Sequence, residues 1–145
     1  GGTPTPHAAN PMRAVVRWRA PVLQTRWIEP RRAVGYGATY RADRPTRIAT
    51  VGVGYGDGYP RALSNGGTAR IDGRSVPVAG RVSMDSLTLD ITGLPADTGE
   101  PGRWVDLADD VHDLDALARE AGTISYELLT GLGRRVRRRH HGADG

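Results

Sequence analysis

Glycine and proline divide the apolar residues of this 145-residue chain into short runs, and this division limits the folds open to it. The sequence holds 20 glycines, 10 prolines and no phenylalanine. Runs of about four to eight residues between turn formers are typical of β-strands, whereas helices of ordinary length need longer uninterrupted segments. The sequence therefore predicts a mainly β domain, and its length suits one domain with a sizeable core.

Side chains that alternate between apolar and polar indicate where the strands lie. In the first run, Trp18 shares a face with Ala14 and Val16, and arginines occupy the other face. The same reasoning predicts strands over residues 13–19, 48–53, 69–71, 75–78, 87–91 and, more weakly, 104–107. Asp72-Gly73-Arg74 should connect two of them as a compact hairpin, because Asp-Gly tolerates positive φ.

The periodicity changes after residue 110. Apolar residues at i, i+3, i+4 and i+7 predict an amphipathic helix over residues 114–121, with Asp113 as its N-cap and Gly122 at its end. A second short helix is expected over residues 125–130, with Thr123 capping its start and Gly131 its end. The tail from residue 134 reads as a last strand or as an exposed arm.

The chain contains no lysine, so all 20 of its cationic side chains are arginines. It also lacks cysteine, which excludes disulfides and thiolate metal sites. Its four histidines are scattered without ligand spacing, and we expect no metal site. No apolar run approaches the roughly 20 residues that cross a bilayer, and no signal-peptide pattern opens the chain, so we expect no membrane partner.

The positive charge is concentrated near the C-terminus. The net charge is +4, the pI is near 10.1, and five arginines crowd residues 134–139. Such a run can bind a polyanion, which keeps a non-catalytic binding module open as an interpretation. No aromatic residue lies between these arginines to stack on a base, and we expect no nucleic-acid partner.

Four of the five tyrosines, Tyr36, Tyr40, Tyr55 and Tyr59, lie in two glycine-rich segments. Glycine gives a tyrosine nothing to pack against but lets a ligand approach the backbone closely. A tyrosine hydroxyl can move a proton where nearby charge lowers its pKa, although Gly-Tyr pairs also occur in ordinary bulges and turns. The glycines from residue 52 to 58 do not fit a dinucleotide fingerprint, and a lysine-bearing phosphate loop is impossible here.

A third segment, residues 80–85, places Arg81, a serine and Asp85 around one turn. Its backbone N–H groups and Arg81 could hold a substrate carboxylate, with Asp85 orienting the arginines. A surface ion pair at the entry to a strand explains the same spacing equally well.

Taken together, these segments resemble the C-terminal domain of alanine racemase, an enzyme family that uses pyridoxal phosphate. The matching pieces run in family order: AVGYGATYRA at 33–42, VGYGDGYPRALSNGG from 53, PVAGRVSMD at 77–85 and GTISYELLTGLGRRV at 122–136. The resemblance implies a small β-barrel-like domain with two short helices near the C-terminus. It places the domain at 11–139 and a tail at 140–145, while the polar, Gly/Pro-rich opening at 1–10 reads as a linker or a remnant of an upstream segment.

The resemblance assigns roles to residues by position. Tyr36 matches the base that removes the α-proton of L-alanine, Met84 the residue whose backbone N–H contacts the substrate carboxylate, and Tyr126 the tyrosine that hydrogen-bonds the cofactor phosphate. The positions that line the family's substrate corridor are matched by Tyr55, Arg61, Arg81, Asp85 and Ile124.

In that family a (β/α)8 barrel, absent from this sequence, carries the lysine that binds pyridoxal phosphate as a Schiff base. The resemblance therefore implies a cytoplasmic, homodimeric bacterial racemase that interconverts L- and D-alanine by two-base proton transfer and supplies D-alanine for peptidoglycan. This chain alone should be inactive because it has no lysine. Two alternatives remain open: a relative acting on another small amino acid, and a non-catalytic β module that binds a protein or a polyanion.

Overall fold

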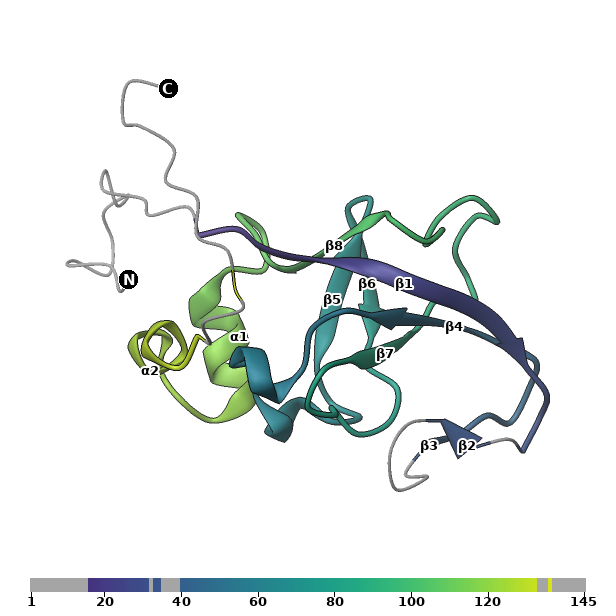
Figure 1. The fold of residues 1–145 in the computed structure, drawn as a ribbon, viewed down its shortest axis with the longest axis horizontal. Helices are drawn as coiled ribbons and strands as arrows, with labels where there is room; N and C mark the ends of the chain where they lie inside the picture. Colours follow the sequence, from purple (N-terminus) through teal and green to yellow (C-terminus); the bar gives the residue numbers. More distant parts are fainter. Residues whose placement is uncertain (1–15, 32, 35–39, 133–135, 137–145) are drawn as a thin grey trace.

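One six-stranded antiparallel sheet forms the body of the molecule, and two short helices lie at one end of it (Figure 1). The structure is a computed structural model that describes residues 16–31, 33–34, 40–132 and 136. The strands are β1 (Trp18–Ile28), β4 (Thr46–Val51), β5 (Thr68–Ile71), β6 (Arg74–Pro77), β7 (Leu87–Asp90) and β8 (Trp104–Ala108). They pair in the order β6-β5-β8-β1-β4-β7.

The two edge strands of this sheet meet again just beyond the end of β6. Val78 forms an isolated antiparallel bridge with Leu89 of β7. The Ala79 N–H donates to the Thr88 carbonyl at 2.9 Å, and the Thr88 hydroxyl donates to the Ala79 carbonyl. Pairing the edges in this way satisfies backbone groups that an open sheet would leave exposed. The result is the nearly closed, barrel-like β domain that the sequence predicted.

Alternate residues of the strands point into one shared core. Ala49 and Val51 of β4 are fully buried there with Leu87 and Leu89 of β7. Ile48 lies on the opposite face of β4, where it is buried in a second, smaller cluster with Ile28, Ala42 and Ala79. The predicted alternation in β4 and β7 is confirmed, and burial of Ile48 shows that β4 is covered on both faces.

Strand β1 differs most from its prediction over residues 13–19. It begins at Trp18, continues to Ile28 and includes Pro21, whose missing N–H did not end the strand. The predicted alternation holds where the two ranges overlap, with Trp18 buried between the exposed Arg17 and Arg19. Past Val22 the register shifts at a bulge, which moves the following side chains to the other face. Residues 13–15 of the prediction lie outside the described residues.

The predicted hairpin between β5 and β6 is present, with a tighter turn than expected. Asp72 and Gly73 have φ of 50° and 78°, the left-handed values of a two-residue hairpin turn. Arg74 therefore belongs to β6, where it pairs with Ile71.

Both predicted helices are present. In α1 (Leu114–Ala121) the Asp113 side chain accepts a hydrogen bond from the Ala116 N–H, and Gly122 ends the helix at φ 77°. Gly131 ends α2 (Ser125–Thr130) as predicted, but Thr123 does not cap its start. The N-cap is Ile124, and the Thr123 hydroxyl instead donates to the Glu127 carboxylate at 2.5 Å.

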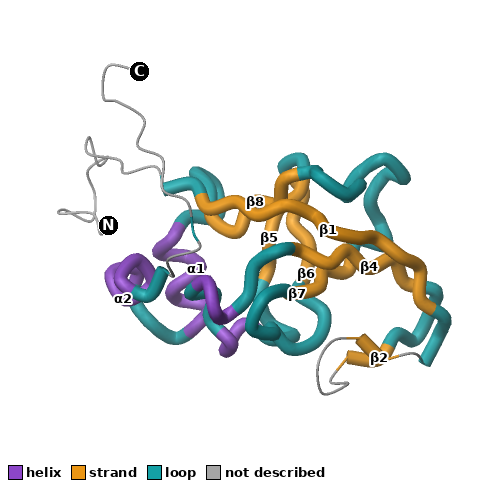
Figure 2. Tube along the Cα trace, in the orientation of Figure 1, coloured by secondary structure: helices purple, strands orange, loops and turns teal. Residues whose placement is uncertain are grey.

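Three shorter elements complete the description. Two 3-10 turns, η1 (Tyr55–Asp57) and η2 (Arg61–Leu63), follow β4, and a small hairpin pairs β2 (Ala33–Val34) with β3 (Tyr40–Arg41). Figure 2 shows the strands of the large sheet together, with the β2–β3 hairpin apart from them and the α-helices gathered at the opposite end. Residues 35–39, which include Tyr36, lie outside the described residues, as do most of the arginine-rich tail and the predicted linker.

Tyr59 is a buried tyrosine whose hydroxyl has no hydrogen-bond partner among the described residues. Its ring is 1% exposed and lies 5.9 Å from that of Trp18. Burial, with a smaller effect from Glu120, raises the pKa of the Tyr59 hydroxyl far above its usual 10.0. A buried, unpaired hydroxyl destabilises a fold by about 1–3 kcal/mol.

Replacing Tyr59 with phenylalanine should therefore increase the free energy of unfolding at pH 7 by about 1 kcal/mol. Because the raised pKa belongs to the folded state, the wild-type chain should lose stability as pH rises above about 10, where the unfolded tyrosine ionises first. The Phe variant should lose less. Urea unfolding at pH 7 and pH 11 measures both effects, with the exposed Tyr55→Phe as control. A less stable Phe variant at pH 7 would show that the hydroxyl has a partner.

Candidate active site

The second glycine-rich segment, which contains Tyr55, lies against the Ser-Met-Asp segment through backbone contacts. The Tyr55 N–H donates to the Ser83 carbonyl at 3.0 Å, and the Gly56 N–H donates to the Met84 carbonyl at 2.9 Å. This pairing places η1 beside the 83–86 turn. Both side chains at the junction face solvent, since Tyr55 is 43% exposed and Met84 is 54% exposed.

Gly54 is the residue that allows this approach. A Cβ at position 54 would lie 2.2 Å from the Ser83 carbonyl oxygen and 2.5 Å from that of Met84. Real Cβ atoms do not come so close to backbone oxygens, so only glycine fits without a shift of the turn. The buried Asp57 carboxylate accepts a hydrogen bond from the Gly54 N–H at 3.0 Å and fixes the same junction from its other side.

The 80–86 segment is held by hydrogen bonds to the residues just after η2. The Val82 N–H donates to the Ser64 hydroxyl at 2.9 Å, and the Gly80 N–H donates to the Asn65 side-chain oxygen at 2.6 Å. Within the turn, the Ser83 N–H and hydroxyl both donate to the Ser86 carbonyl. The Met84 N–H has no acceptor among the described residues, which leaves it available to an anionic ligand.

Two arginines belong to the segments that form this junction. The Arg61 guanidinium lies over the Tyr55 ring, 5.1 Å from its centroid. Arg81 is exposed, and in the described part of the chain no carboxylate lies within 4.0 Å of either guanidinium. Unneutralised arginines beside a free N–H attract a small carboxylate and orient it. Asp85 is also exposed, and its orienting role toward the arginines stays a prediction.

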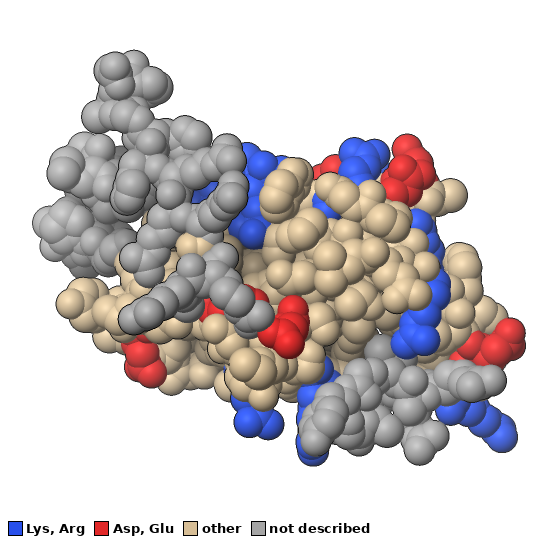
Figure 3. All heavy atoms as spheres, in the orientation of Figure 1, with Lys and Arg blue, Asp and Glu red and all other residues tan. Residues whose placement is uncertain are grey.

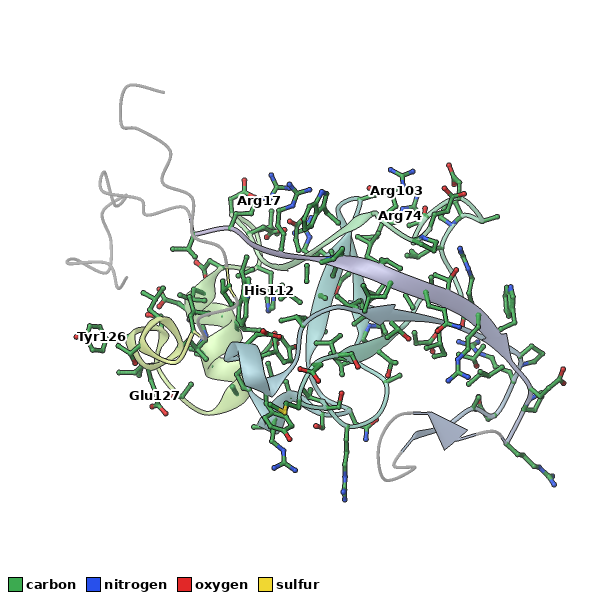
Figure 4. The ribbon with its side chains drawn as sticks, in the orientation of Figure 1. Arg17, Arg74, Arg103, His112, Tyr126 and Glu127 are labelled. Carbon is green, nitrogen blue, oxygen red and sulfur yellow. The ribbon has the colours of Figure 1, made fainter. Side chains whose placement is uncertain are left out.

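Tyr126 lies on α2 and Ile124 at its N-cap, on a different part of the surface. Tyr126 is 73% exposed and points outward from the helix, away from the barrel (Figure 4). The end of α2 contacts the second glycine-rich segment, because a Cβ on Gly58 would lie 2.5 Å from the Gly131 carbonyl oxygen. The structure thus brings Tyr55, Arg61 and Met84 together and leaves Tyr126 apart from them. Tyr36 lies outside the described residues.

Sequence reasoning missed the residues that position this site. Asp57, Ser64 and Asn65 were assigned no role from the sequence, yet the side chain of each accepts a hydrogen bond from a backbone N–H of the junction or of the 80–86 segment. Their signal in the sequence was turn chemistry, since Asp, Ser and Asn accept such hydrogen bonds in turns.

Charged side chains are dispersed over the face of the molecule in view. Figure 3 shows arginines in several separate places on the face in view, with acidic side chains between some of them. No group of three His, Asp or Glu side chains that could hold a metal occurs among the described residues. In the same ranges no helix is long and apolar enough to cross a bilayer.

Comparison with known proteins decides the family. The model of the alanine racemase C-terminal domain family matches residues 15–140. The chain belongs to this family. Among its relatives, the alanine racemase of Acidiphilium cryptum is 56% identical over 95% of this chain, and the catabolic alanine racemase of Agrobacterium fabrum is 50% identical over 95%. The chain spans 38% and 36% of the length of these two proteins, so it corresponds to one part of a racemase.

Solved racemase structures share the fold. A structure of alanine racemase from Bartonella henselae with covalently bound pyridoxal phosphate superposes with a TM-score of 0.85 at 40% identity, over 90% of this chain and 36% of that one. The biosynthetic alanine racemase of Pseudomonas aeruginosa superposes with a TM-score of 0.81 at 41% identity, over 87% of this chain and 35% of that one. The fold predicted for an alanine racemase C-terminal domain is confirmed.

Proposed function

We propose that this chain forms the C-terminal half of an active site that interconverts L- and D-alanine with pyridoxal phosphate. The observation that carries the proposal is the junction of Tyr55, Arg61 and Met84, where cations and a free N–H meet on the surface of a racemase-family domain. An exposed half-site of this kind needs a second surface to complete it. In the solved relatives this chain corresponds to about a third of the protein, which leaves room for that surface.

The donors of this chain fit an anionic cofactor and an anionic substrate, but not covalent attachment. The chain has no lysine, so the Schiff base must form on a residue outside it. Tyr126, 73% exposed, would donate its hydroxyl to the cofactor phosphate. The Met84 N–H would donate to the alanine carboxylate, with Arg61 and Arg81 drawing that carboxylate toward the junction. When bound, pyridoxal phosphate would withdraw electrons from the α-carbon of alanine and make the α-proton of alanine more acidic.

The proton step assigned to this chain belongs to Tyr36. Its phenolate would take the α-proton of L-alanine on one face. In the D-to-L direction, the same side chain would return a proton to that face. A second base on the opposite face would complete racemisation, and one short segment of chain cannot supply both. We infer that the other base comes from a (β/α)8 barrel domain and that the complete enzyme is a homodimer in the cytoplasm that supplies D-alanine for peptidoglycan.

Domain replacement tests this proposal. The matched C-terminal part of the Acidiphilium cryptum alanine racemase is exchanged for this chain, and conversion of L-alanine to D-alanine is measured. We expect the hybrid to racemise alanine at a rate no more than about 100-fold below that of the unmodified Acidiphilium cryptum enzyme. Some loss is expected because imperfect contacts between the exchanged domain and the rest of the enzyme would displace the two parts of the active site by a fraction of an ångström. A folded hybrid that binds pyridoxal phosphate but forms no D-alanine would contradict the proposal.

A further inference from the structure

Arg47 of β4 is a cation held beneath the surface at the end of the barrel. Its side chain lies opposite Trp27 in the β1–β4 pairing, and the residue is 8% exposed. Its Nη1 donates to the Pro95 carbonyl at 3.2 Å and its Nη2 to the Ala96 carbonyl at 2.9 Å. The Arg47 N–H also donates to the Thr92 hydroxyl at 3.1 Å. The guanidinium is therefore fixed in place by the loop that follows β7.

No carboxylate of the described residues pairs with this buried charge. Other arginines of the chain are paired, such as Arg17 with Asp106 at 3.0 Å and Arg70 with Asp109 at 3.4 Å. Around Arg47, by contrast, no Asp or Glu oxygen of the described residues lies within 4.0 Å. The two carbonyls use two of the five N–H donors of a guanidinium. A buried cation without a countercharge is costly, so an external anion would be stabilised there.

A hollow opens directly over Arg47. Its volume is about 360 Å³, and it is lined by Thr25, Arg26, Trp27, Arg47, Leu94 and Ala96. Trp27 is 62% exposed and gives the hollow an indole wall, and the exposed Arg26 adds a second cation at its rim. Mouths of β-barrels are frequent ligand sites, and a combination of apolar walls with a few fixed polar groups is typical of them.

We propose that this hollow binds a small oxyanion that carries a flat apolar group. The carboxylate or phosphate would accept hydrogen bonds from the remaining N–H groups of Arg47, in the forked geometry that guanidinium favours, with Arg26 beside it. The flat group would stack on the Trp27 indole. The hollow shares no residue with the Tyr55–Met84 junction, and β1 ends on the far side of the molecule from α1 and α2 (Figure 1). The inference therefore stands apart from racemase activity.

Benzoate and benzamide test the proposal on the full chain. Both carry the same ring, but only benzoate carries a negative charge. In NMR titrations, we expect benzoate to shift the Trp27 indole N–H resonance until the shift saturates, with a dissociation constant of about 1 mM. A higher salt concentration should weaken this binding. Benzamide should bind at least about 10-fold more weakly. Equal shifts by the two compounds, or no saturable shift with benzoate, would overturn the proposal.

Substitutions locate the binding. Arg26→Gln should weaken benzoate binding about 3-fold, as expected for one exposed charge, and Arg47→Lys should weaken it about 10-fold by removing the fork. Arg119→Gln, in α1 at the other end of the molecule, removes the same charge and should leave affinity unchanged (Figure 1). Because Arg26 is exposed, the Arg26→Gln variant should fold, and it keeps the test valid if the Arg47→Lys variant unfolds. Equal losses in Arg26→Gln and Arg119→Gln would show a general charge effect and overturn the assignment.

Discussion

Tyr36→Phe is expected to lower racemisation in the domain-replacement hybrid by about 10²- to 10⁴-fold, the usual contribution of a general base. The substitution keeps the ring and removes only the hydroxyl that would take the α-proton. Exchange of the L-alanine α-proton with deuterated solvent should collapse. Exchange from D-alanine should survive better, because a base on the opposite face serves it. Both rates are measured by proton NMR of the two enantiomers.

Tyr40→Phe is the matched control for this substitution. Tyr40 lies in the same glycine-rich segment, four residues along, and also loses only a hydroxyl. Its effect on racemisation should be small. Loss of L-alanine exchange in Tyr40→Phe, with exchange intact in Tyr36→Phe, would show that the base had been assigned to the wrong tyrosine.

Gly54→Ala should disrupt the candidate site and the fold together. The added Cβ would lie 2.2 Å from the Ser83 carbonyl oxygen, which must move. We expect the free energy of unfolding to fall by at least about 2 kcal/mol, as for other overpacked positions. Because a misplacement of about 1 Å can cost about 100-fold in rate, racemisation by the hybrid should fall by at least that factor. Urea unfolding and racemisation assays measure the two effects.

Gly93→Ala provides the corresponding control. No atom lies within 4 Å of the Cβ that alanine would add at Gly93. Replacement there should leave activity unchanged and keep stability within about 1 kcal/mol of the original chain, because alanine mainly restricts the unfolded state. A Gly54→Ala variant as stable and active as Gly93→Ala would mean that the Tyr55–Met84 junction is not required.

Local chemistry made much of the fold predictable. The Asp72-Gly73 turn needs two residues that accept positive φ, and the helix at Leu114–Ala121 combines an Asp cap, apolar periodicity and a terminal glycine. Each signal lies within a few residues of the structure it specifies. Strand β7 was equally evident because its side chains alternate without interruption, whereas β4 was marked by a short, almost wholly buried run.

Longer-range features were not predictable in this way. The length of β1 was missed because Pro21 and the bulge after Val22 interrupt the alternation, while pairing with β4 and β8 on either side sustains the strand. The contact of Gly54 with the Ser83 carbonyl depends on two segments far apart in the sequence. The family resemblance suggested the Met84 assignment, but only the structure shows that Tyr55 adjoins Met84 while Tyr126 points elsewhere (Figure 4). The assigned roles of these residues stay predictions.

Mixing two separate domains tests most directly whether this chain supplies half of a catalytic site. Racemisation of L-alanine, with excess pyridoxal phosphate, is compared for the chain alone, for the barrel part of the Acidiphilium cryptum relative alone, and for both together. We expect activity only in the mixture, rising with the concentration of the chain until it saturates. Borohydride reduction should then place a phosphopyridoxyl group on the barrel part and on no internal residue of this chain, which has no lysine. Turnover by the chain alone, with labelling of one of its internal side chains, would contradict the account.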